Sequence, residues 1–114
     1  MALTPEEAAE RRRASALVRL YGITSEDYDR LLAHQGGKCA ICRKPPGRIR
    51  LAVDHCHRAK KVRGLLCAYC NNKVIGNLTQ TLIAAAALYM ADPPADAVLG
   101  QHHAAGRPRK RRHR

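Results

Sequence analysis

A chain of 114 residues has room for one domain with a modest hydrophobic core, and four Tyr with no Phe or Trp make that core smaller still. The formal net charge of +12 favours a polyanionic partner. Nucleic acid is favoured over an anionic membrane, because no basic amphipathic helix with large apolar anchors accompanies the charge. The N-terminus lacks the apolar segment of a signal peptide, and the longest apolar stretch, residues 78–91, is too short to span a bilayer. A soluble, cytosolic protein is therefore expected.

Two helices are predicted in the N-terminal region, residues 1–37. Thr4, which is followed by Pro and two acids, is a typical N-cap, so a helix should run from it to about Leu20. A second helix should begin where Thr24 and Asp27 form a capping box, and a pair of glycines should end it.

The middle region, residues 38–91, is predicted to hold a β-hairpin followed by helices. The β-branched-rich runs 49–53 and 61–66 flank a polar turn, which is typical of a hairpin. A third helix should cover residues 68–75 and end at a glycine, and an alanine-rich helix should cover residues 78–90.

The final region, residues 92–114, begins with Asp-Pro-Pro and ends with GRPRKRRHR. Such a basic, low-complexity sequence is expected to be disordered. It is either a contact for a phosphate backbone or a solvated or targeting tail. Under the first interpretation the DNA-binding residues are Arg107, Arg109, Lys110, Arg111, Arg112 and Arg114.

Two Cys-x-x-Cys pairs are the strongest structural signal. One tight turn can present Cys39 and Cys42 to a tetrahedral ion, and a second turn can present Cys67 and Cys70, which together complete a structural zinc site. A total of five cysteines is odd, and a reducing cytosol disfavours disulfides. A redox role for one pair is the alternative, but a thioredoxin-like βαβ context is absent. Cys56 is left over, and we expect it to be a buried, unreactive thiol or a swapped zinc ligand.

A polar cluster accompanies the second cysteine pair. Asp54, His55 and His57 precede this pair, and Asn71 follows its last cysteine directly. Hydrolysis of a phosphodiester at neutral pH requires a strong nucleophile and neutralisation of the developing charge. The Asp54 carboxylate and the Asn71 amide oxygen suit a hard cation whose shell is completed by water and phosphate. His55 suits a general base, because an imidazole can accept a proton near neutral pH.

This chemistry makes a geometric demand on the backbone. In a regular strand Asp54 would face away from His55 and His57. For Asp54 and His55 to address one ion and one water, the chain must bend or bulge there. The zinc-bound turn at Cys70 would in turn set where the third helix begins, and so where Asn71 points.

The motifs resemble those of the recombination endonuclease VII family of phage and bacteria. The similarity rests on YGITSEDYDRLLAHQGGKCAICRKPP and LAVDHCHRAKKVRGLLCAYCN, and it extends over roughly residues 21–89. It implies an α+β fold, namely a small zinc-stapled ββα-metal (HNH) nuclease core with N-terminal helices and a C-terminal helix. It also implies a DNA endonuclease in the cytoplasm of a bacterial or phage-infected cell, with neither a membrane nor a small-molecule substrate as partner.

The resemblance also implies roles for the polar cluster. Asp54 and Asn71 would bind a catalytic Mg²⁺ or Mn²⁺, His55 would activate water, and His57 would lie near the phosphate or the leaving group. The DNA cleaved is linear, nicked or branched, and the oligomeric state stays open. Basic residues that flank the cluster are the candidates for phosphate contacts: Arg48, Arg50, Arg58, Lys60, Lys61 and Arg63.

Two other functions compete with a nuclease. The first is a non-catalytic zinc module that only binds nucleic acid, but such a module has no need of Asp, His and Asn in this arrangement. The second is a zinc-organised protein-interaction domain similar to a RING, which the charge of +12 disfavours.

Overall fold

The computed structural model of the protein describes residues 2–101, 103 and 105. The chain divides into two compact units, Met1–Asn77 and Leu78–Arg114. This division differs from the boundaries expected after residues 37 and 91. The N-terminal helices are not separate from the hairpin, because side chains of both contribute to one hydrophobic core.

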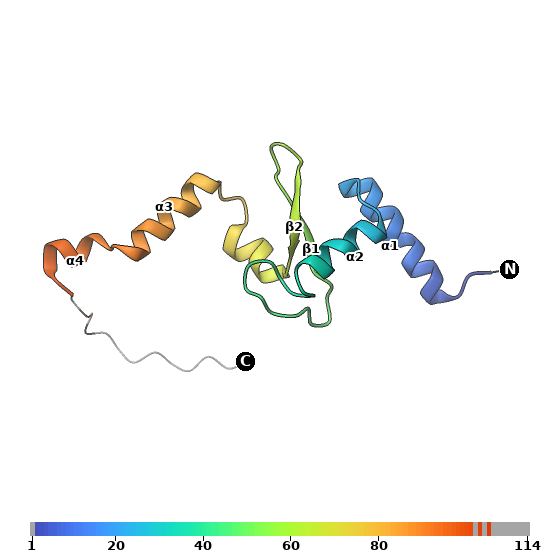
Figure 1. Ribbon diagram of the computed structural model, residues 1–114, viewed down its shortest axis with the longest axis horizontal. Helices are drawn as coiled ribbons and strands as arrows, with labels where there is room; N and C mark the ends of the chain where they lie inside the picture. Colours follow the sequence, from blue (N-terminus) through green and yellow to red (C-terminus); the bar gives the residue numbers. More distant parts are fainter. Residues whose placement is uncertain (1, 102, 104, 106–114) are drawn as a thin grey trace. The chain divides into compact units, whose positions relative to one another are not determined.

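The first unit begins with two capped helices (Figure 1). Helix α1 covers Pro5–Tyr21; its N-cap Thr4 accepts a hydrogen bond from a backbone amide of the first turn, and Gly22 ends it in the left-handed conformation (φ 69°). Helix α2 covers Ser25–His34, and both hydrogen bonds of the capping box at Thr24 are formed. Both predicted helices are confirmed. They could be predicted because hydrogen bonds between residues close in sequence specify where they begin.

The core of the first unit is small, and buried polar contacts reinforce it. The Tyr28 hydroxyl donates a 2.6 Å hydrogen bond to the Leu51 carbonyl. The buried amide of Gln35 joins the end of α2 to Leu65: it donates to the Leu65 carbonyl and accepts from the Leu65 amide, both at 2.9 Å. The buried apolar side chains are Leu17, Tyr28, Cys39, Leu51, Val53, Leu65, Leu66 and Cys70.

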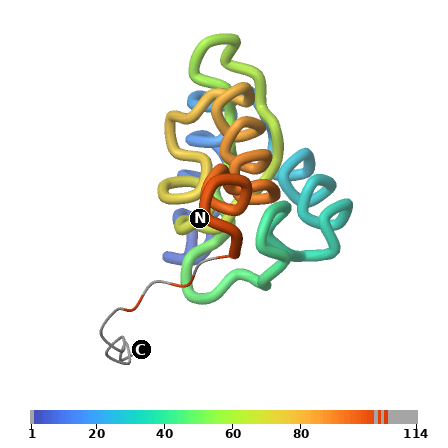
Figure 2. The backbone as a smooth tube through the Cα atoms, turned by 90° about the vertical axis from the view of Figure 1, so that its left-hand side faces the viewer, coloured from blue at the N-terminus to red at the C-terminus, as the bar shows by residue number. Residues whose placement is uncertain are grey.

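The hairpin is shorter than predicted. Strand β1 covers Ala52–His55 and pairs in antiparallel register with strand β2, Val62–Leu66. The predicted strand over residues 49–53 is therefore displaced toward the C-terminus, and Ile49 is 75% exposed in the preceding loop. Figures 1 and 2 show the turn between the strands projecting from the first unit.

The segment after the second cysteine pair is a π-helix, η1, over Cys70–Ile75, where an ordinary helix over residues 68–75 was predicted. Its wider turn is closed by the Gly76 amide, which donates to the Asn71 carbonyl at 3.1 Å. Gly76 has a positive φ of 44°, and a Cβ there would lie 3.1 Å from the Asn72 carbonyl oxygen. Single π-helical turns often occur at functional sites.

The second unit contains helices α3, Gln80–Ala91, and α4, Pro94–Leu99. Thr79 caps α3 by accepting a hydrogen bond from the Leu82 amide, and the predicted alanine-rich helix is confirmed. Disorder was expected from residue 92 onward, but residues 94–99 form helix α4. Pro94 is the first residue of this helix, a position that proline tolerates. None of the residues of α3 and α4 is buried.

One stretch among the described residues, Gln80–Leu99, has the length and apolar composition needed to cross a membrane, with a mean hydropathy of 1.3. It is longer than the expected apolar segment because α4 extends it. The stretch is interrupted at Asp92, whose φ and ψ of −139° and 76° are not helical. A single stretch of this kind is weak support for a membrane span.

Candidate active site and metal centre

Four cysteines form a cluster that could bind zinc. Their sulfur atoms all lie within 4.8 Å of one another, and those of Cys42 and Cys67 are 3.8 Å apart. Metal–sulfur bonds of about 2.3 Å in a tetrahedron imply sulfur–sulfur edges of about 3.8 Å, so the cluster has the size of a zinc site. The predicted set is brought together in full: Cys39, Cys42, Cys67 and Cys70.

Burial and hydrogen bonding shift the pKa values of two of these thiols in opposite directions. Burial raises the pKa of Cys39, but backbone amides of Cys67 and Cys42 donate to its sulfur and lower the pKa to about 6. Burial and the neighbouring thiols raise the pKa of Cys70 to about 12. A cation among the four sulfurs would favour the deprotonated form of every one of these thiols, because metal-bound cysteines are thiolates.

Cys56 lies outside the cluster, so it is not a swapped ligand. It is half-buried rather than buried, which corrects the expected environment. Its backbone amide donates to the Lys61 carbonyl at 2.8 Å across the turn of the hairpin. Hydrogen bonds from the amides of Ala59 and Arg58 lower the pKa of its thiol.

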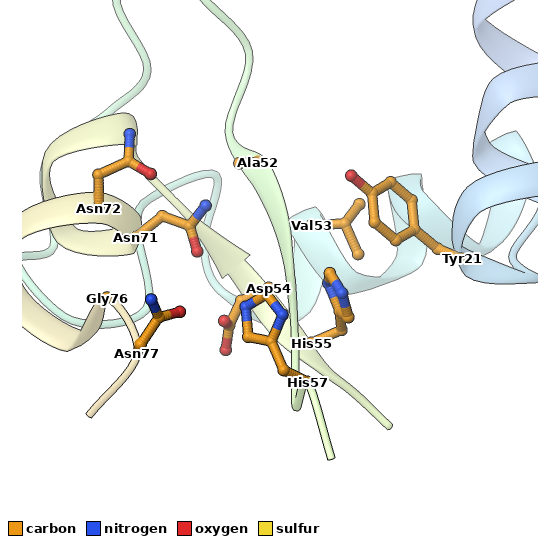
Figure 3. A pocket seen from close by; sticks show the side chains of 10 residues that line it. All are labelled: Tyr21, Ala52, Val53, Asp54, His55, His57, Asn71, Asn72, Gly76 and Asn77. Atoms are coloured by element: carbon orange, nitrogen blue, oxygen red, sulfur yellow. The ribbon is translucent and has the colours of Figure 1, made fainter. Parts of the chain in front are cut away.

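The predicted polar cluster converges on one pocket of about 320 Å³ (Figure 3). Asp54 is 7% exposed, and the side chains of Asn71 and Asn77 point toward the Asp54 carboxylate. The full lining is Tyr21, Ala52, Val53, Asp54, His55, His57, Asn71, Asn72, Gly76 and Asn77.

Asp54 and His55 both line the pocket, and a β-bulge lies beside them. Asp54 pairs with Gly64 but His55 pairs with Val62, so Arg63 has no partner on β1. The predicted irregularity is thereby confirmed, although the extra residue lies in β2 rather than beside the histidine.

Asn71 is fixed by the zinc-site backbone. Its amide donates to the Cys67 carbonyl at 2.9 Å, and its carbonyl accepts from the Gly76 amide at 3.1 Å. The Cys70 amide donates to the Cys67 sulfur at 3.4 Å. Asn71 is thus held between a cysteine of the cluster and the end of the π-helix.

Tyr21 is a site residue that sequence reasoning missed. The ring centroids of Tyr21 and His55 are 5.5 Å apart, and those of His55 and His57 are 4.9 Å apart. The three rings also border a second, adjoining hollow whose other lining residues are Leu20, Lys60 and Val62. Tyr21 follows directly after the expected end of the first helix, and the sequence does not link it to the histidines.

Arg63 differs from the other predicted phosphate contacts. Its Nε and Nη2 atoms donate to the two carboxylate oxygens of Asp54 at 2.7 and 2.9 Å, and this hydrogen bonding raises the pKa of Arg63. The prediction of a simple phosphate contact omitted this partner. Arg50 makes a looser ion pair, 3.8 Å from Glu10.

The remaining predicted contacts among the described residues are exposed side chains in the first unit: Arg48, Arg58, Lys60 and Lys61. The predicted tail contacts lie outside the described residues: Arg107, Arg109, Lys110, Arg111, Arg112 and Arg114.

The chain matches a known protein family over most of its length. The family described as recombination endonuclease VII matches residues 14–92, which include the cysteine cluster and the pocket. The chain belongs to the recombination endonuclease VII family.

Two phage proteins are similar to this member of the family. The Gene 59 protein of Mycobacterium phage D29 is 41% identical over 88 residues, which are 75% of this chain and 53% of that protein. The Gene 59 protein of Mycobacterium phage L5 is 39% identical over 88 residues, or 75% of this chain and 54% of that protein. The chain therefore spans about half the length of these relatives. No solved structure matches it significantly.

Proposed function

We propose that the chain is a metal-dependent, HNH-type endonuclease that hydrolyses DNA phosphodiester bonds at the pocket of Asp54, His55, His57 and Asn71. The main support is the convergence of these four side chains on one pocket in a member of an endonuclease family. The net charge of +12 favours the approach of a polyanion.

The residues fit a divalent hard cation. A buried carboxylate and an amide are oxygen donors of the kind that Mg²⁺ and Mn²⁺ prefer, and Asp54 and Asn71 would hold the ion. When bound, the cation supplies neutralisation of charge on the phosphate and the leaving oxygen.

The chain's own side chains would carry the proton transfers. His55 accepts a proton from a water molecule as the water oxygen bonds to phosphorus and the bond from phosphorus to the leaving sugar oxygen breaks. His57 lines the same pocket. There it would contact the phosphate or the leaving oxygen. Tyr21 packs on His55 and limits the orientations of its imidazole.

The zinc site would act through structure. A zinc ion held by four thiolates has no open position for water. Its binding would fix the Cys67 carbonyl, to which the Asn71 amide donates, and so orient the asparagine.

One observation favours a second function, a non-catalytic zinc module that binds nucleic acid. Both carboxylate oxygens of Asp54 accept hydrogen bonds from Arg63, as they would in a purely structural ion pair.

A cleavage assay separates the two functions. We expect the zinc-loaded chain to nick or cut supercoiled plasmid, linear duplex or four-way junction DNA when Mg²⁺ or Mn²⁺ is added. Binding of all three DNAs without cleavage in either metal would favour the second function.

A further inference from the structure

Asp54, the proposed metal ligand that lines the pocket, also forms an ion pair with Arg63, which is not one of the lining residues. The Asp54 side chain is only 9% exposed, whereas that of Arg63 is 44% exposed, so the guanidinium reaches from solvent to a buried carboxylate. Arg63 occupies the extra position of the β-bulge, which makes this pairing part of the backbone geometry of the hairpin.

We propose that Arg63 makes binding of the catalytic cation conditional on DNA, because its guanidinium cancels the charge of Asp54 until a DNA phosphate restores negative charge at the site. The inference rests on the proposed function. Arg63 is thus a positioning residue that acts through Asp54.

The charges around the pocket support this coupling. Asp54 is the only acidic residue among the described residues that line the pocket, and the neighbouring donors Asn71 and Asn77 are neutral amides. With Arg63 paired to Asp54, the site has no net negative charge. The affinity of oxygen sites for divalent cations depends on the number of charged ligands. A neutral site should therefore bind Mg²⁺ or Mn²⁺ weakly by itself.

The geometry allows Arg63 and the cation to share the carboxylate. An ionised carboxylate has about four lone-pair positions on its two oxygens. Arg63 donates one hydrogen bond to each oxygen of Asp54, which leaves further lone pairs for a cation. Arg63 therefore neutralises and orients Asp54 without excluding the metal.

Linkage makes the coupling reciprocal. If a bound phosphate raises the affinity for the cation, the cation raises the affinity for DNA by the same factor, typically about 5–150-fold. The enzyme would then assemble its metal site on the substrate, and free cation would be held poorly without DNA.

The test measures Mn²⁺ binding to the zinc-loaded full chain by electron paramagnetic resonance, with and without a short DNA duplex. His55→Ala provides the parent background, so that the DNA is not cleaved, and a titration of the duplex alone is subtracted. We expect the affinity of the parent for Mn²⁺ to be higher by about tenfold or more when DNA is present.

The variant Arg63→Gln in this background should bind Mn²⁺ more tightly without DNA and gain less from DNA. A neighbouring opposite charge alters proton affinity at a carboxylate by about 10–1,000-fold. Because Arg63 is half exposed, we expect a change near the low end, about tenfold. Arg30→Gln is the matched control: it removes the same charge from an exposed position of the first unit that does not line the pocket, and Mn²⁺ affinity without DNA should stay close to that of the parent.

Unchanged or weaker Mn²⁺ binding by Arg63→Gln, or equal binding by the parent with and without DNA, would overturn the inference and leave the nuclease proposal standing. Arg63→Lys keeps the charge beside Asp54 and should retain most of the coupling. Equal Mn²⁺ affinity of the Lys and Gln variants would show that charge is not the cause. Failure of the parent to bind Mn²⁺ in both conditions would overturn the inference together with the proposed metal site.

Discussion

The ring of Tyr21 lies against the ring of His55, with centroids 5.5 Å apart and planes inclined by 56°. Tyr21 is the last residue of α1, and Gly22 turns the chain directly after it. The contact therefore connects the N-terminal helix to the proposed general base.

Tyr21→Ala should lower kcat by about tenfold, because the His55 imidazole loses its packing partner. This loss is a part of the ~10²–10⁴-fold rate enhancement that a general base contributes. KM for DNA should change little. Tyr21→Phe keeps the ring and should restore most of kcat, and single-turnover cleavage measures both variants. A Phe variant as slow as the Ala variant would show that the hydroxyl, rather than packing, is what matters.

His55→Ala should reduce cleavage by about 10²–10⁴-fold, because the water is no longer deprotonated by a positioned base. Zinc content and DNA affinity should stay near those of the unmodified chain. Cleavage rates at saturating DNA, with zinc measured on the same samples, check this expectation. Turnover close to that of the unmodified chain would remove His55 from the role of base.

Replacement of any one cluster cysteine by Ser, for example Cys70→Ser, should reduce zinc content and unfold part of the first unit. A structural zinc contributes its binding free energy to folding, and a chelator strong enough to remove it should have the same effect. Cys56→Ser is the matched control, since Cys56 lies outside the cluster. Circular dichroism and zinc analysis of both variants give the answer, and equal zinc content in the two would contradict the structural role.

Local signals predicted the parts of the fold that depend on neighbouring residues. The caps at Thr4 and Thr24 involve residues three positions away, and the spacing of the cysteines describes one tight turn at each pair. The Asp54–Arg63 pair could not be predicted in this way, because it depends on the register and the bulge of two strands. Tyr21 was missed for the same reason: its contact with His55 depends on how α1 packs on the hairpin.

Gln35→Ala should destabilise the first unit by about 1–3 kcal/mol, because it leaves the buried Leu65 amide without its hydrogen-bond partner. It also removes one of two donors to the Leu65 carbonyl, which still accepts from the Ala40 amide at 3.2 Å. The same side chain also donates to the Lys38 carbonyl at 2.9 Å. Urea unfolding of the zinc-loaded chain measures the free energy of unfolding. His34→Ala, an exposed position at the end of the same helix, is the control and should lie within about 0.5 kcal/mol of the unmodified chain. A Gln35 variant as stable as the control would show that water replaces these bonds.

Deletion of residues 106–114 should weaken DNA binding without conferring or removing sequence preference. The segment contains Arg107, Arg109, Lys110, Arg111, Arg112 and Arg114 and no large apolar side chain. If about four to six of these charges engage phosphates, the log–log dependence of affinity on salt should become flatter by roughly 4–5 units, at about 0.9 per contact. The loss of affinity should be greatest at low salt, where counterion release contributes most. Turnover at saturating DNA should stay nearly unchanged, because none of the pocket residues is removed. Affinity measured across a salt series for both forms decides the matter, and identical slopes would mean that the segment does not contact DNA.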